Sequence, residues 1–196
     1  MSIHRSARRR EVSTLVLLHG YPETWYAWHK VLPELAKHYH VIAPDLRGAG
    51  GSDAPAGGHD IGTMVAYAYA AAHPDVTKLA LTEAPIPDQK LYSSPSLTPQ
   101  GAGSWNLGFF NVRNGLPERM IQGREAEWID GFADMLEYNK DGVTAADARI
   151  YGRYMQRSGH LRASLEWFRA FNQDVADNAV NAHTKLTMPV LALGAQ

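Results

Sequence analysis

The sequence contains no cysteine among its 196 residues. A disulfide framework, a thiolate nucleophile and a cysteine-ligated metal site are therefore excluded, and cysteine usage gives no indication of the compartment. Neither sign of charge is in excess, because 19 lysine and arginine residues stand against 20 aspartate and glutamate residues. The resulting net charge of −1 does not favour a nucleic acid or an anionic membrane surface as a partner.

Long apolar runs and metal-binding patterns are also missing. The first apolar run, residues 15–18, is short for a secretory signal and far too short to cross a membrane. We therefore expect a soluble, cytoplasmic protein with no membrane partner. The nine histidines lack the spacing of a metal site, and the glycines at 48–51 lack the context of a phosphate loop. We expect no metal and no cofactor.

The sequence does contain the alternating pattern of an α/β protein. Hydrophobic residues make up 45% of the chain, enough for one sizeable core. Short continuous apolar runs predict buried strands at residues 15–18, 41–43, 79–82 and 190–193, and an alanine-rich segment predicts a helix at 61–72. This order predicts a mostly parallel sheet flanked by helices.

The composition changes after Pro87, which indicates an insertion. Residues 93–104 are rich in serine, proline and glycine and predict a loop, and helical patterns without a convincing strand follow it. We expect three parts: residues 1–86 form the α/β core, residues 87–183 form a helical cap, and residues 184–196 return to the core as a strand.

The segment Gly58-His59-Asp60-Ile61-Gly62 has small residues on both sides of a possible nucleophile. In such an elbow the nucleophile lies on a strained turn at the start of a helix, where larger flanking side chains would clash with neighbouring backbone. An aspartate there can attack a carbon directly to give an ester, and the helix N-terminus favours its negative charge. The segment also fits a second interpretation, in which Asp60 only caps the following helix.

Three motifs occur in order along the chain: His19-Gly20-Tyr21-Pro22-Glu23-Thr24-Trp25, the glycine-rich segment 44–53, and the elbow segment 58–62. Together they resemble the α/β-hydrolase superfamily. The aspartate between glycines resembles the branch of epoxide hydrolases and haloalkane or haloacid dehalogenases. Segments 104–110, 116–118 and 158–162 are similar to the helical cap of those enzymes. The resemblance implies an incomplete α/β-hydrolase fold with a helical cap insertion.

The resemblance also implies roles for residues near the elbow. Asp60 is the implied nucleophile, and the backbone N–H groups of Tyr21 and Ile61 are the implied donors to an oxyanion or a halide. His19 and Gly20 belong to the same turn on that side of the site. A turn of this kind offers backbone N–H groups to an anion, although it also fits an ordinary strand-to-helix connection.

The resemblance further implies that the cap closes over a small apolar organic substrate, an epoxide or a halogenated compound. The candidate substrate-binding residues are Trp105, Tyr151, Tyr154 and Phe168. Epoxide hydrolases of this type use tyrosine hydroxyls to protonate the epoxide oxygen, but Phe168 stands where such a tyrosine is usual and has no such proton. Tyr151 and Tyr154 can supply a hydroxyl or simply pack. Dehalogenase-like relatives often have histidine in place of Asn106, so the leaving group stays open.

Two departures from the family pattern bear on activity. Only residues 54–58 separate the glycine-rich segment from the elbow, too few for the helix and strand that relatives have there. We expect a loop and an internal deletion, with no strand to hold Asp60 at the sheet edge.

The resemblance also bears on the partner groups of the nucleophile. Glu83 stands where some members have the acid that orients the catalytic histidine, but it also fits a solvated carboxylate of a loop. No histidine occurs in the order that relatives have, so we expect a C-terminal truncation at Gln196.

The sequence thus predicts an α/β hydrolase of the epoxide hydrolase or dehalogenase type, in which Asp60 attacks a substrate carbon to form an alkyl-enzyme ester. Hydrolysis of that ester needs a histidine-activated water, so the chain as given is expected to be inactive in turnover. The alternative is a catalytically inactive fragment or a small-molecule-binding module. A serine esterase is excluded because no Gly-x-Ser-x-Gly segment occurs. The oligomeric state stays open.

Overall fold

The computed structural model describes residues 13–46, 59–99, 101–139 and 141–194. The loop predicted at 54–58, most of the glycine-rich segment and Gly58 lie outside these residues. No helix within the described part of the chain is long and apolar enough to cross a membrane.

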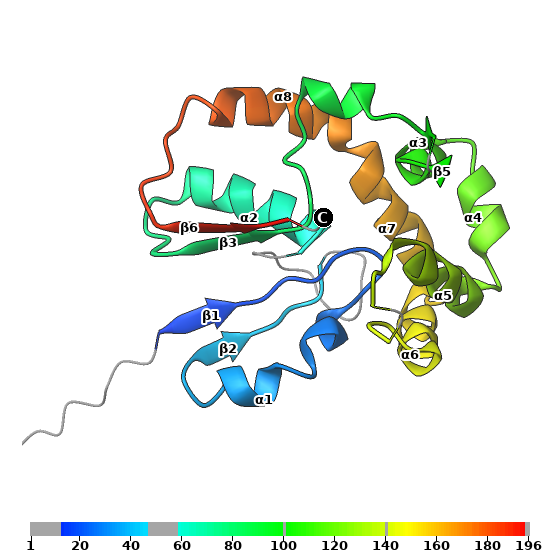
Figure 1. Cartoon of the computed structure of the whole chain (residues 1–196), viewed down its shortest axis with the longest axis horizontal. Helices are drawn as coiled ribbons and strands as arrows, with labels where there is room; N and C mark the ends of the chain where they lie inside the picture. The colour runs from blue at the N-terminus through cyan, green and yellow to red at the C-terminus, as the bar shows by residue number, and fades with distance from the viewer. Residues whose placement is uncertain (1–12, 47–58, 100, 140, 195–196) are drawn as a thin grey trace, which may run out of the picture.

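Two pairs of parallel strands form the α/β part (Figure 1). Strand β1 (Thr14–Val16) pairs with β2 (His40–Ile42), and β3 (Leu79–Thr82) pairs with β6 (Val190–Leu193). The last two strands have the predicted bounds, and the first two lie within two residues of them. Parallel pairing of β3 with β6 requires a long connection, and the helical segment supplies it.

The helices of the α/β part follow from local sequence. A 3-10 helix η1 (Trp25–Trp28) precedes the short helix α1 (Leu32–Leu35), and Pro33 lies in the first turn of α1, where its missing N–H costs no hydrogen bond. Helix α2 (Ile61–Ala72) packs against β3, because Ala66 and Ala70 are small enough to bring it close to Leu79.

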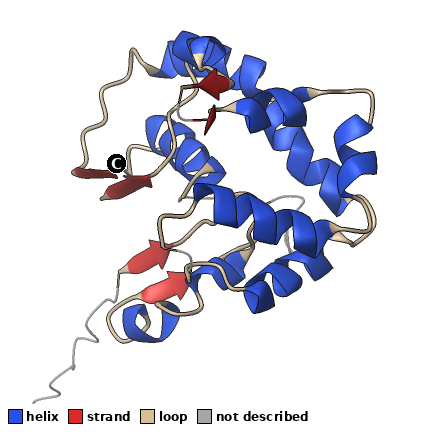
Figure 2. Ribbon diagram, turned by 45° about the vertical axis from the view of Figure 1, so that its right-hand side comes forward, coloured by secondary structure: helices blue, strands red, loops and turns tan. Residues whose placement is uncertain are grey.

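In the described part of the segment 87–183, which was predicted as the cap and keeps that name below, lie six α-helices: α3 (Trp105–Asn111), α4 (Leu116–Ile121), α5 (Glu125–Leu136), α6 (Ala145–Met155), α7 (His160–Arg169) and α8 (Phe171–Asn181). A 3-10 helix η2 (Gln89–Ser93) leads into them. Figure 2 shows most of these helices on one side and the two parallel strand pairs on the other. Helix α8 returns over the α/β part and contacts α2.

The prediction of a loop without strands at residues 93–104 is wrong at one place. Strands β4 (Leu97–Thr98) and β5 (Gly101–Ala102) form an antiparallel pair inside the segment predicted as a loop. Two residues are too few to produce a period-two pattern, so the sequence carried no signal for this pairing.

An aromatic cluster joins the cap to the α/β part. The Tyr21 ring, from the turn after β1, lies 4.9 Å from the Phe110 ring and 5.1 Å from the Phe168 ring, measured between centroids. Phe132 of α5 completes the contact at 5.8 Å. Burying each such side chain contributes roughly 1.5–3 kcal/mol, so this cluster is a main source of cohesion between the two parts.

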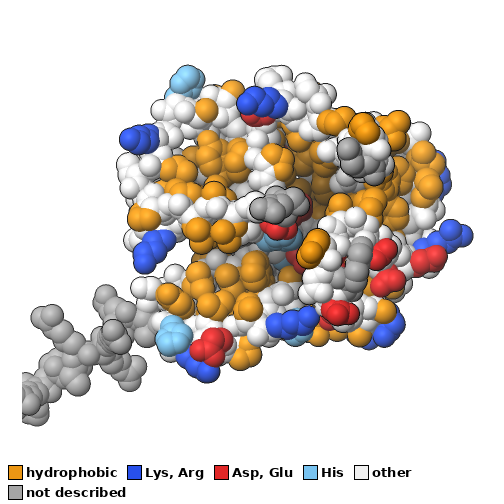
Figure 3. Space-filling model, viewed as in Figure 1, with side chains coloured by type: hydrophobic (Ala, Val, Ile, Leu, Met, Phe, Trp, Pro, Cys, Tyr) orange, Lys and Arg blue, Asp and Glu red, His pale blue; other side chains and the backbone are white. Residues whose placement is uncertain are grey.

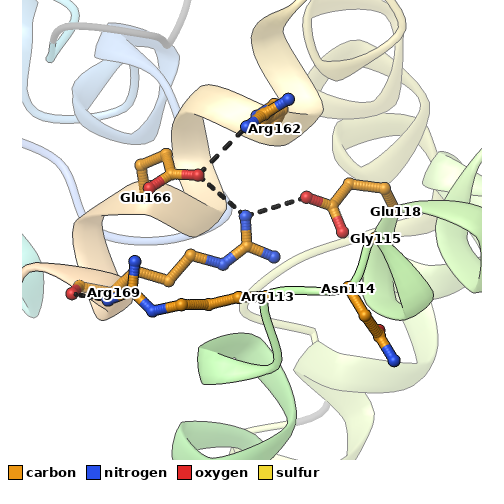
Figure 4. A pocket seen from close by; sticks show the side chains of 7 residues that line it. All are labelled: Arg113, Asn114, Gly115, Glu118, Arg162, Glu166 and Arg169. Atoms are coloured by element: carbon orange, nitrogen blue, oxygen red, sulfur yellow. Dashed lines mark hydrogen bonds and ion pairs between the residues drawn. The ribbon is translucent and has the colours of Figure 1, made fainter.

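Arg169 ties three cap helices together (Figure 4). Its side chain is 3% exposed and pairs with Glu118 of α4 and Glu166 of α7, each at 2.8 Å from Nη1. It also donates to the carbonyl oxygens of Phe110 at 3.1 Å and Val112 at 2.8 Å, at the end of α3. A polar cavity of about 380 Å³ lies beside this network.

We expect Arg169→Met to lower the free energy of unfolding by roughly 3–5 kcal/mol, because it leaves buried carbonyls and the Glu118 carboxylate without their partner. The matched control is Arg162→Met, which removes an exposed ion pair to Glu166 and should cost less than about 1 kcal/mol. Urea unfolding followed by circular dichroism measures both. Equal losses in the two variants would contradict the role of Arg169.

Candidate active site

Asp60 lies on a strained turn between a strand position and helix α2. Its backbone has φ 54° and ψ −120°, a conformation that non-glycine residues rarely adopt. The turn is fixed by its neighbours: the His59 N–H donates to the Leu18 carbonyl oxygen at 3.0 Å, and the Asp60 N–H donates to the Thr82 carbonyl oxygen at 3.3 Å. His59 also forms a parallel bridge with Thr82.

The expectation that nothing holds Asp60 at the sheet edge is therefore wrong. His59 occupies the strand position between Leu18, just beyond β1, and the end of β3. The first turn of α2 adds a further anchor, because the Thr63 hydroxyl donates to the Thr82 carbonyl oxygen at 2.8 Å and accepts from its N–H at 3.0 Å.

The structure does not support Asp60 as a side-chain cap of α2. Asp60 occupies the N-cap position, but its side chain lacks the usual capping hydrogen bond to the second or third residue of the helix. Instead its Oδ1 accepts the Tyr21 N–H at 3.1 Å, and the Ile61 N–H also bonds to the carboxylate. Burial raises the pKa of the Asp60 carboxyl above its usual range, although these N–H groups and His59 act in the opposite direction.

Two glycines allow this close packing. A Cβ at Gly62 would lie 2.8 Å from the His19 carbonyl oxygen, and a Cβ at Gly20 would lie 2.6 Å from the Asp60 Cβ. Neither contact leaves room for a side chain, so glycine is required at both positions for steric reasons.

His59 lies between two carboxylates. Its Nδ1 is 3.5 Å from Oε2 of Glu23, and its Nε2 is 3.7 Å from Oε2 of Glu83. Burial alone would lower the pKa of His59, but the hydrogen bond and charge of Glu23, together with the charges of Asp60 and Glu83, raise it to about 9. His59 is therefore an imidazolium at neutral pH, and it holds the pKa of Glu23 below its usual range despite burial.

His19 binds the backbone that carries the site, at Gly20 and Leu46. Its Nε2 accepts the Leu46 N–H at 2.9 Å, so the proton lies on Nδ1, which donates to the Gly20 carbonyl oxygen at 2.8 Å. Burial lowers the pKa of His19, which keeps the ring neutral. The resemblance placed His19 on the oxyanion or halide side of the site. Its fully buried ring does not line the cavity, so within that turn it supports the backbone.

A cavity of about 580 Å³ lies over Asp60. Polar side chains line one end of it: Glu23, His59, Asp60 and Glu83. The walls come from the cap and are largely apolar, including Leu107, Ile129, Phe132, Tyr151, Phe168 and Phe171. In Figure 3, acidic and histidine atoms are visible within a hollow bordered by hydrophobic surface.

The structure divides the four predicted substrate-binding residues. Tyr151 and Phe168 line the cavity with Asp60 and Glu83. Trp105 does not line the cavity, and its Nε1–H donates to the Met135 sulfur at 3.3 Å within the cap. Tyr154 does not line the cavity either, and its ring packs under the Arg157 guanidinium at 4.7 Å. The prediction of these two residues as substrate contacts is not supported by their positions.

Sequence reasoning missed Glu23 as a residue of the site. It directly follows the His-Gly-Tyr-Pro turn, so its place in that motif was the available signal. Within the described residues, no group of three or more histidine, aspartate and glutamate side chains could hold a metal ion.

Comparisons with known proteins show which family this chain resembles. Residues 13–57 match the alpha/beta hydrolase fold family. The chain is 29% identical to the soluble epoxide hydrolase of Corynebacterium sp. (strain C12), over 92% of this chain and 73% of that enzyme. A shorter segment, 24% of this chain and 15% of its relative, is 50% identical to a fluoroacetate dehalogenase of Burkholderia sp.. The crystal structure of Cfl2 from Burkholderia cenocepacia matches with a TM-score of 0.81 at 37% identity, covering 94% of this chain and 72% of that one.

The chain belongs to the α/β-hydrolase superfamily. Within it, the chain falls among the relatives of epoxide hydrolases and dehalogenases, which confirms the resemblance inferred from the three motifs. The fold class, an α/β-hydrolase fold with parallel strands flanked by helices, is confirmed as well.

We expect Gly62→Ala to destabilise the protein by roughly 1–3 kcal/mol, because the new Cβ meets backbone that cannot move away. The matched control is Gly131→Ala in the middle of α5, where a Cβ meets nothing within 4 Å. That change should stabilise the protein by roughly 0.5–1 kcal/mol, the difference in helix propensity. Thermal unfolding of the two variants tests the elbow packing, and a neutral Gly62→Ala would contradict it.

Proposed function

We propose that Asp60 is the nucleophile of an epoxide hydrolase-type or dehalogenase-type reaction on a small apolar organic substrate. One carboxylate oxygen forms a bond to a substrate carbon. At the same time the bond from that carbon to the epoxide oxygen or to a halogen breaks, and the leaving atom keeps the electron pair. The product of this step is an alkyl ester of Asp60.

The observation that carries the proposal is the Asp60 carboxylate, held on a strained turn with the Tyr21 and Ile61 N–H groups bonded to it. These N–H groups fix the direction of the carboxylate. They also lie where charge develops on the carbonyl oxygen when an ester of Asp60 is attacked by water. Residues that line the cavity around Asp60 are largely apolar on the cap side, which suits the small organic compounds that relatives are named for.

Opening an epoxide also requires a proton for the leaving oxygen. Tyr151 is the proposed donor, since it lines the cavity and Phe168, which also lines it, has no hydroxyl. Burial raises the pKa of Tyr151 well above its usual range, so the hydroxyl keeps its proton until the oxygen becomes basic. The hydroxyl of Tyr21 instead accepts a hydrogen bond from Trp128 Nε1 at 3.2 Å.

Hydrolysis of the ester requires a base, and the site offers a poor one. His59 is the histidine among the described residues that line the cavity, and its ring is already protonated at neutral pH. We therefore propose that this 196-residue chain forms the ester and releases it slowly. The same arrangement supports a second function, binding of a small organic molecule without turnover.

Incubation with a reactive terminal epoxide, followed by peptide mass mapping, should give a stable ester on Asp60 and background release of diol. Asp60→Asn should abolish the adduct, because an amide is a far weaker nucleophile. The matched control is Asp174→Asn, since Asp174 also has a raised pKa through burial but does not line the cavity. If the wild-type protein forms no adduct, Asp60 is not the nucleophile and only the binding function remains. Rapid multiple turnovers would contradict slow release of the ester.

Tyr151→Phe should separate the two possible leaving groups. Alkylation by an epoxide should slow by about 10²-fold, because the alkoxide then leaves without a proton. Alkylation by a primary alkyl bromide of the same length should change little, because bromide leaves without one. Tyr154→Phe is the control and should affect neither rate. Equal effects of Tyr151→Phe on both reagents would contradict its role as an acid.

A further inference from the structure

The Glu23 side chain connects the two chain segments that meet at Asp60. Its Oε2 accepts the Gly20 N–H at 3.0 Å and lies 3.5 Å from Nδ1 of His59. Gly20 precedes Tyr21, whose N–H bonds to Asp60, and His59 precedes Asp60 itself. Oε2 of Glu23 thus connects the turn that carries the Tyr21 N–H donor to the elbow that carries the Asp60 acceptor.

Glycine at position 20 explains why such a connection is needed. A side chain there would collide with the Asp60 Cβ at 2.6 Å. The residue beside the Tyr21 donor must therefore be glycine, which has the largest backbone freedom of any residue. The hydrogen bond from Gly20 to Glu23 removes that freedom at the position where it would misplace the Tyr21 N–H.

Burial makes Glu23 the stronger of the two partners of His59. The Glu23 side chain is 18% exposed, whereas the Glu83 side chain is 49% exposed and lies slightly farther away, at 3.7 Å. Water screens the Glu83 charge more effectively, so most of the attraction on the imidazolium comes from Glu23. The charged groups that face His59 are Glu23 from the turn after β1, Glu83 from the end of β3, and Asp60.

We propose that Glu23 is a positioning residue, which acts through Gly20 and the His59 imidazolium to hold the Tyr21 N–H against the Asp60 carboxylate. Glu23 does not touch the reacting atoms in this role. The inference rests on the proposed function of Asp60 as the nucleophile, and it adds a requirement that His59 remain charged.

The requirement has a direction in pH. The pKa of His59 in the folded protein is about 9, above the ordinary value of 6.5 that applies when the chain is unfolded. The stabilising contribution of the charged ring is therefore complete below about pH 6.5 and is lost as the pH rises through about 9. The alkylation rate of Asp60 should rise as its carboxyl ionises and fall again as His59 loses its proton.

The test uses Glu23→Gln, because glutamine keeps an oxygen acceptor for the Gly20 N–H but removes the charge. Glu83→Gln is the matched control. NMR titration of isotope-labelled histidine should place the pKa of His59 near 9 in wild type. It should fall by about one unit or more in Glu23→Gln and by clearly less in Glu83→Gln. At pH 8 a fall of one unit leaves about half of the His59 rings charged instead of about nine-tenths, so the epoxide alkylation rate of Glu23→Gln should be about twofold below wild type. The decline of the rate at high pH should also begin at a lower pH than in wild type.

The two proposals fail in different ways. Absence of a wild-type adduct overturns Asp60 as nucleophile, whereas the titration and hydrogen exchange of the Tyr21 amide still report whether Glu23 holds this turn. Faster exchange of that amide in Glu23→Gln, but not in Glu83→Gln, supports the inference. An unchanged His59 titration, an unchanged alkylation profile or a wild-type pKa of His59 below 7 overturns it. If Glu23→Gln does not fold, two other measurements decide the question. One is the wild-type titration of His59. The other is the pH profile of alkylation in His59→Gln, which should no longer show the fall in rate at high pH.

Discussion

The parallel bridge between His59 and Thr82, together with the bond from the His59 N–H to the Leu18 carbonyl oxygen, is the contact on which the rest of the site depends. It connects the pair β1 and β2 to the pair β3 and β6 at the point where their carboxyl ends meet. Ligands of open α/β sheets bind at such ends. The bridge fixes the backbone of Asp60, the start of α2 and the polar end of the cavity at the same time.

Tyr21 links this anchor to the cap. Its backbone N–H bonds to Asp60, and its ring packs between Phe110, Phe132 and Phe168 of the cap helices. A shift of the cap would therefore move the donor that orients the Asp60 carboxylate. The apolar packing that closes the cavity and the polar geometry at its floor depend on one residue, so cap cohesion and site geometry are coupled.

Much of the fold could be predicted because its signals are local. The apolar runs at 79–82 and 190–193 and the alanine-rich helix at 61–72 have the predicted bounds. The pair β4 and β5 could not be predicted, since two-residue strands leave no periodic pattern. Within the candidate site, the motif pointed to Asp60 and the neighbouring N–H groups, whereas the exclusion of Trp105 and Tyr154 from the cavity depends on how the cap helices are rotated.

By itself, the sequence determined the superfamily, the absence of thiol chemistry and the need for glycine beside Asp60, since motif order, composition and residue size are properties of the chain. Only the tertiary structure decided whether Asp60 caps a helix or lies on an anchored elbow, and whether His59 is neutral or charged. Those outcomes depend on Leu18, Thr82, Glu23 and Glu83, which are distant from Asp60 in sequence. Hydrogen bonds and charge interactions act over a few ångströms of space, so residue spacing along the chain does not reveal them.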